Sequence, residues 1–113
     1  MRKLTLRNIN GKDYTLELTR DSVKWLEANG FSIEEFFKKP ITYFDLLWMS
    51  LFIANHKEVN SNLALKLMET YEKNGKKASK VVNFAIEEYQ NFMNALSDIN
   101  SKENDEELEI TEA

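Results

Sequence analysis

Apolar and polar residues alternate along the first part of the chain, on either side of an Asn-Gly pair at residues 10–11. The apolar members of the two runs all fall at even positions: Leu4, Leu6, Tyr14, Leu16 and Leu18. A period of two is typical of half-buried strands, and Asn-Gly between two such runs favours a tight turn. The sequence therefore predicts a β-hairpin over residues 2–18.

The length of the turn decides whether these apolar residues share one face of the hairpin. A two-residue loop would place Leu6 opposite Thr15 and divide the apolar residues between the two faces. A three-residue loop, residues 9–11, pairs Leu6 with Tyr14 and keeps them together, with Gly11 in the left-handed conformation. We therefore predict the three-residue loop.

Capping and stop signals divide the rest of the chain into helices. Candidate N-cap residues precede apolar runs, and Gly30, Pro40 and Gly75 each lie at a break between runs. The candidate caps are Thr19 or Asp21, Ser32, Thr42, and Asn60 or Ser61. These signals predict five helices, over about residues 20–29, 32–38, 42–55, 61–73 and 77–99.

Two of these helices have informative patterns. Residues 43–54 are apolar on all sides, so this helix must be buried on all sides, and it is too short to cross a membrane. The last helix carries a stripe at alternating spacings of four and three residues, which is typical of a coiled-coil seam. The stripe consists of Ala78, Val82, Ala85, Tyr89, Phe92, Leu96 and Ile99.

These elements predict an α+β fold in one domain, residues 1–100, with the N-terminal β-hairpin packed on a bundle of about four to five helices. Residues 101–113 contain six acids and one lysine and have a net charge of −5. Such a segment can bury too little apolar surface to offset the conformational entropy that it would lose on folding. We therefore expect residues 101–113 to be a disordered acidic tail.

Composition narrows the classes of function. The chain has no cysteine and one histidine, which excludes disulfides, zinc ribbons and thiol nucleophiles. His56 has no neighbouring nucleophile, and adjacent glutamates such as Glu87-Glu88 point about 100° apart on a helix, so they do not converge on one proton or metal. We expect a protein without enzymatic activity or cofactor, located in the cytoplasm and bound to no membrane.

A group of four lysines is the main argument for a nucleic-acid partner. Lys73, Lys76, Lys77 and Lys80 surround Gly75. Residues 1–100 nevertheless have a net charge of only +1, whereas nucleic-acid-binding modules usually carry a strongly basic face. We therefore expect solvated lysines here and consider a nucleic-acid partner the weaker alternative.

Aromatic residues are numerous for a domain of this size, with seven Phe, two Trp and four Tyr. They either fill a dense core or form a surface that covers another chain, since interfaces favour aromatic anchors. We take five residues as candidates for partner binding: Trp48, Phe52, Phe84, Phe37 and Phe44.

The order of motifs over about residues 3–75 resembles the small tail assembly chaperones of long-tailed bacteriophages, especially those of Gram-positive hosts. Three features carry the resemblance. An extended pair leads to a helix that starts with an acid and closes at Asn29-Gly30-Phe31. The turn SIEEFF follows, and then comes an apolar helix led by Pro40 and ended by a polar break.

The resemblance implies a binding protein that keeps the tape-measure protein soluble until tail-tube subunits polymerise around it. It further implies a homo-oligomer whose partners are the tape-measure protein and the tail-tube protein. Such a chaperone would act in the host cytoplasm and would be missing from the mature virion. The alternatives are a small phage regulatory or nucleic-acid-binding protein, and a structural tail or head-completion subunit.

Overall fold

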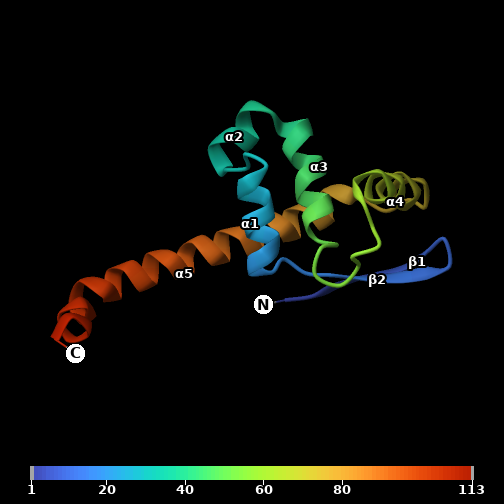
Figure 1. Cartoon of the computed structure of the whole chain (residues 1–113). Coiled ribbons are helices and arrows are strands. Elements are labelled where there is room, and N and C mark those ends of the chain that lie inside the picture. Colours follow the sequence, from blue (N-terminus) through green and yellow to red (C-terminus); the bar gives the residue numbers. More distant parts are fainter. Residues whose placement is uncertain (1, 113) are drawn as a thin grey trace.

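The computed structural model describes the backbone of residues 2–112 and the side chains of residues 2–96. Within this range the chain forms a two-stranded hairpin and five helices, which confirms the predicted α+β fold (Figure 1). In chain order they are β1 (Leu4–Ile9), β2 (Lys12–Leu16), α1 (Arg20–Ala28), α2 (Ile33–Lys38), α3 (Pro40–Ser50), α4 (Ser61–Lys73) and α5 (Ala78–Glu112). The predicted disorder of residues 101–113 lies outside the part of the chain whose side chains are described, and it stays a prediction.

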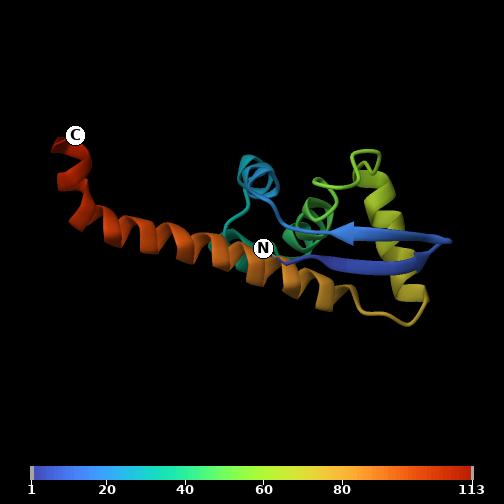
Figure 2. The same ribbon diagram turned by 90° about the horizontal axis from the view of Figure 1, so that it is seen from below.

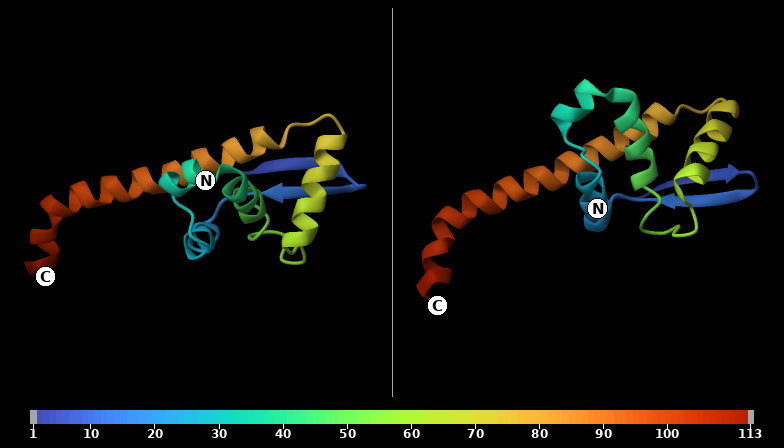
Figure 3. Two further views of the ribbon diagram at one scale, coloured as in Figure 1. Left: turned by 90° about the horizontal axis from the view of Figure 1, so that it is seen from above. Right: turned by 45° about the horizontal axis from the view of Figure 1, so that its top comes forward.

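The helix α3 occupies the centre of the fold. It contacts each of the other four helices, while α4 also contacts α5 and the strand β1. Figures 2 and 3 show α4 crossing the hairpin and α5 passing beside α3 and α1. A helix with neighbours on this many sides needs apolar residues all around it, as its sequence predicts.

The register of the hairpin is as predicted, but its turn is not. Leu6 pairs with Tyr14 in an antiparallel ladder, whereas Ile9 pairs with Lys12. The loop therefore has two residues, Asn10 and Gly11, with positive φ angles of 54° and 79°. Two positive φ angles define a type I′ turn, for which Asn-Gly is the preferred sequence.

A β-bulge reconciles the short turn with the predicted pairing. Between the paired positions, Arg7 and Asn8 together oppose the single residue Asp13. Asn8 adopts a positive φ of 56°, and its backbone N–H donates to Asp13 Oδ1 at 2.8 Å. The extra residue turns Ile9, only 1% exposed, onto the buried face.

The boundaries of α3 differ from the predicted 42–55. The helix starts at Pro40 because proline suits the first helical position, where no N–H is needed, so Thr42 is not the cap. It ends at Ser50, and the carbonyl of Leu51 accepts a hydrogen bond from the N–H of Glu17 at 3.2 Å. The following residues therefore bond to the hairpin instead of continuing the helix.

These residues cover the outer edge of β2. The backbone N–H of Thr15 donates to His56 Nε2 at 2.9 Å, and Asn55 Nδ2 donates to Glu17 Oε1 at 3.0 Å. Paired edge groups protect a sheet from pairing with other chains. His56 therefore accepts a hydrogen bond that helps to close this edge of the hairpin.

The other helix starts follow the sequence signals. The side chains of Thr19, Ser32 and Asn60 accept hydrogen bonds from backbone N–H groups in the first turns of α1, α2 and α4. The last helix, α5, is longer than the predicted 77–99. It starts next to a lysine-rich loop that contains Gly75.

Replacing Gly30 with alanine is expected to destabilise the fold more than the same change at Gly75. Both glycines have φ above 80°, so each substitution costs about 1–2 kcal/mol of backbone strain. A Cβ at Gly30 would also lie 3.1 Å from the hydroxyl oxygen of buried Tyr43. A Cβ at Gly75 would have no neighbouring heavy atom within 4 Å. We expect a further loss of about 1 kcal/mol at Gly30 in urea unfolding. Equal losses for the two variants would contradict the close approach of Tyr43.

Candidate protein-binding surface

Two of the five aromatic candidates lie in the core, so the prediction that they bind a partner at the surface is wrong. Trp48 is 0% exposed and Phe52 is 1% exposed. The indole N–H of Trp48 donates to the carbonyl of Ala64 at 2.7 Å, and its ring lies 5.6 Å from that of Phe52. The central position of α3 provides enough surrounding surface to bury both rings.

Phe44 and Phe84 are half-buried and pack against the core from different elements. Phe84, on α5, is covered by the N-terminal segment, since the guanidinium of Arg2 lies 5.2 Å from its ring centre. Phe44 belongs to α3. The structure therefore does not bring the five candidates together in one surface.

Arg2 is held on α5 by two adjacent glutamates. Its Nε donates to Glu88 Oε2 at 3.0 Å and its backbone N–H donates to Glu88 Oε1 at 3.0 Å, while Nη2 contacts Glu87 Oε1 at 3.0 Å. Glu88 is 3% exposed, so it is a buried carboxylate, whereas the side chain of Glu87 is 62% exposed. Burial raises the pKa of Glu88, but hydrogen bonds from Arg2 and Asn91 outweigh it, so the pKa lies below its ordinary value.

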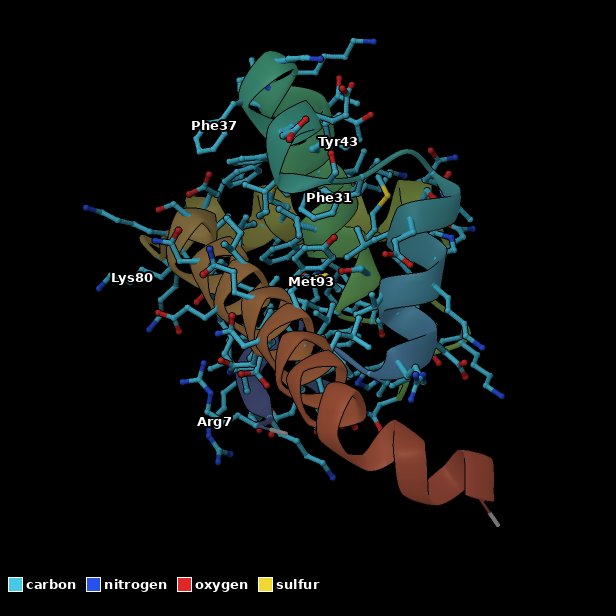
Figure 4. The ribbon with its side chains drawn as sticks, turned by 90° about the vertical axis from the view of Figure 1, so that its left-hand side faces the viewer. Arg7, Phe31, Phe37, Tyr43, Lys80 and Met93 are labelled. Atoms are coloured by element: carbon cyan, nitrogen blue, oxygen red, sulfur yellow. The ribbon has the colours of Figure 1, made fainter. Side chains whose placement is uncertain are left out.

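The largest exposed apolar side chains lie where α2 meets α3. Phe37 is 76% exposed and Ile41 is 80% exposed. Lys38, Lys39 and Pro40 between them are also exposed, and we call residues 37–41 the α2–α3 corner. Phe37 points outward from α2, away from Phe31 and Tyr43 in the interior (Figure 4). Of the five aromatic candidates, Phe37 is the one that is freely accessible.

A second apolar surface lies between α1 and α5. Its groove has a volume of about 350 Å³ and includes Arg20, Val23, Lys24, Phe92, Met93 and Leu96, and we call it the α1–α5 groove. Met93 projects from α5 beside α1 (Figure 4). Leu96 is 44% exposed, although it belongs to the stripe that is buried further upstream.

Sequence reasoning missed Ile41 and the α1–α5 groove. Pro40 was the available signal for Ile41, because it places the start of the helix before that residue and not after it. No local sequence pattern predicts the α1–α5 groove, since the groove depends on how far along α5 the helix α1 packs. The stripe of α5 indicates which face of the helix is apolar. It does not indicate at which residue the other elements of the chain stop packing against that face.

Other charged groups lie outside the α2–α3 corner and the α1–α5 groove. Lys76, Lys77 and Lys80 are exposed, and Lys73 lies 3.5 Å from Glu69. Asp45 is half-buried, and burial raises its pKa.

Among the residues whose side chains are described, no three His, Asp or Glu form a group able to hold a metal ion. No helix in the described part of the chain is both long and apolar enough to span a membrane.

Comparison with known proteins places the chain in a family. No curated protein and no solved structure is significantly similar to it. Residues 1–111 match a family described as Domain of unknown function (DUF5055), and this match includes the hairpin, all five helices and both apolar surfaces. The chain is therefore a member of the DUF5055 family.

Proposed function

We propose that this protein is a tail assembly chaperone of a long-tailed phage, which binds the tape-measure protein and keeps it soluble while the tail tube assembles. The proposal rests on the resemblance over residues 3–75 and on one structural observation: the α2–α3 corner exposes Phe37 and Ile41 almost completely. Chaperoning of this kind requires binding surface and no reaction, so we propose a protein without enzymatic activity.

The α2–α3 corner has the composition of a contact for an amphipathic helix. Aromatic side chains are enriched at interfaces, and anchors at the centre of an interface contribute most of its binding energy. Lys38 and Lys39 lie between the two apolar residues in the sequence and are exposed. An apolar stripe on a partner helix could cover Phe37 and Ile41 while acidic residues beside that stripe meet the lysines.

The proposed place of action is the host cytoplasm, before the virion is complete. The tail-tube protein is the second proposed partner, because tube subunits would have to displace the chaperone from the tape-measure protein. Antibodies against this protein should therefore detect it in infected-cell lysate and not in purified virions. Detection in virions would favour the alternative of a structural tail or head-completion subunit.

Co-expression with the tape-measure protein of the same phage tests the proposal. The wild-type chain should keep that protein in the soluble fraction and co-purify with it. The double variant Phe37→Ser/Ile41→Ser should lose about tenfold or more in affinity, since it removes two exposed anchors without touching the core. Leu63→Ser, at a 36% exposed site on α4, is the matched control and should bind normally.

The outcomes separate the contact surface from the function itself. If the wild-type chain solubilises the tape-measure protein and both sets of variants bind equally well, the α2–α3 corner is not the contact. If the wild-type chain neither binds nor solubilises that protein, the proposed function is wrong. Circular dichroism of each variant checks that its helix content is unchanged, since Phe37 and Ile41 are 76% and 80% exposed and Leu63 is 36% exposed.

A further inference from the structure

A carboxylate without a partner in the described part of the chain lies in a groove between α3 and α4. The groove has a volume of about 540 Å³, and we call it the α3–α4 groove. It is lined by residues of both helices: Asp45, Leu65, Met68, Glu69, Glu72 and Lys73. Lys73 lies 3.5 Å from Glu69, and Glu72 Oε2 accepts a hydrogen bond from the N–H of Ala78 at 3.4 Å. Of the three acids, only Asp45 has no such partner among the described residues.

The placement of Asp45 costs stability. Burial raises the pKa of Asp45, and no hydrogen bond or cation from the described residues offsets this effect. Because α3 starts at Pro40, Asp45 lies beyond the first turn of the helix, in which the helix dipole stabilises an acid. A raised pKa means that the ionised form is less favourable in the folded protein, so the charge of Asp45 destabilises the fold at neutral pH. Features that cost stability in this way concentrate at functional sites.

The α3–α4 groove adjoins the α2–α3 corner. Ile41 and Asp45 are four residues apart on α3, so their side chains are neighbours on one face of the helix. Ile41 is 80% exposed, and Leu65 and Met68 are half-buried on the neighbouring helix α4. An exposed apolar anchor, an unpaired carboxylate and two apolar side chains therefore form one continuous surface.

We propose that the amphipathic helix bound at the α2–α3 corner extends into the α3–α4 groove, where a lysine or arginine of that helix pairs with Asp45. This inference rests on the proposed function, because the helix belongs to the tape-measure protein. The basic residue lies about one helical turn from the apolar residue that covers Ile41. Its aliphatic stem packs on Leu65 and Met68 while its charge reaches the carboxylate. An acidic residue at the same place would be repelled by both Asp45 and Glu72.

Asp45→Asn distinguishes this binding role from a structural one, because it keeps the shape of the side chain and removes its charge. We expect the variant to bind the tape-measure protein of the same phage about tenfold more weakly than the wild-type chain does, and to unfold at a higher urea concentration. Asp21→Asn is the matched control. It removes the same charge from an exposed site on α1 and should bind like the wild-type chain. Equal affinity of the two variants, or a lower urea midpoint for Asp45→Asn, would overturn the inference.

Overlapping peptides of the tape-measure protein test the basic residue of the partner. Replacing that residue with glutamine in a bound peptide should weaken binding to the wild-type chain about tenfold, and binding to Asp45→Asn by less than about twofold. If no basic residue of any bound peptide is coupled to Asp45 in this way, the inference is wrong while the proposed function stands. If neither the peptides nor the intact tape-measure protein bind the wild-type chain, the proposed function is wrong and the inference falls with it.

Discussion

Replacing Trp48 with alanine is expected to lower the free energy of unfolding by about 3–5 kcal/mol. Trp48 has no exposed surface, its indole N–H bonds to the carbonyl of Ala64, and its ring lies 5.8 Å from that of Tyr71. The substitution would leave a large cavity at the junction of α3 and α4. Such a loss is a substantial part of the total stability of an ordinary domain.

Phe37→Ala is the matched control, since it also removes an aromatic ring but from a site that is 76% exposed. We expect its stability to stay within about 0.5 kcal/mol of the wild-type value. Urea unfolding followed by circular dichroism suits both variants, because the signal does not depend on tryptophan. Trp48→Phe provides an intermediate case if the alanine variant does not fold. Equal stability of Trp48→Ala and Phe37→Ala would mean that Trp48 is not part of a packed core.

The contrast between these two residues shows what the aromatic composition could predict. Crowding of aromatic residues in a small domain favoured an exposed surplus, but the same segment is apolar on all sides and so favoured burial. The second argument is correct for Trp48 because α3 contacts four helices, and for Phe52, just after α3, because its ring packs against Trp48 and against Tyr14 of the hairpin. For Phe37 the local pattern was informative, since Phe36 and Phe37 are adjacent on a short helix and cannot both face the core.

The hairpin shows where local patterns are incomplete. Alternation correctly paired Leu6 with Tyr14, and Asn-Gly correctly marked the turn. The bulge was missed because it depends on the bond from the N–H of Asn8 to Asp13, a contact between strands that alternation does not describe. Ile9 was the available signal, since it is an apolar residue at an odd position in a run whose other apolar residues are even.

The two apolar surfaces have different relations to the fold. The α2–α3 corner is short and all five of its residues are exposed, so it can contact a partner without disturbing the core. The α1–α5 groove is continuous with the buried stripe of α5, so whatever covers it also extends the core.

Glu88→Gln is expected to destabilise the protein at neutral pH by about 1–2 kcal/mol, because the buried carboxylate accepts two hydrogen bonds from Arg2. This is less than the loss of about 3–5 kcal/mol typical of breaking a fully buried pair, since the side chain of Arg2 is 57% exposed. Glu87→Gln is the control. Glu87 lies at the same 3.0 Å from Arg2 but is 62% exposed, so its loss should cost less than about 0.5 kcal/mol.

The pH dependence provides the stricter test of this buried carboxylate. Because the pKa of Glu88 is lower in the folded protein than its ordinary value of 4.5, its contribution is fully present above that value and is lost as the pH falls through the folded-state pKa. The difference in unfolding free energy between wild type and Glu88→Gln should therefore stay constant from neutral pH down to the ordinary value of 4.5 and shrink as the pH falls below it. Urea unfolding across this range measures it. A difference that grows on acidification, or equal effects of the two glutamine variants, would show that Glu88 does not hold the N-terminal segment on α5 by its charge.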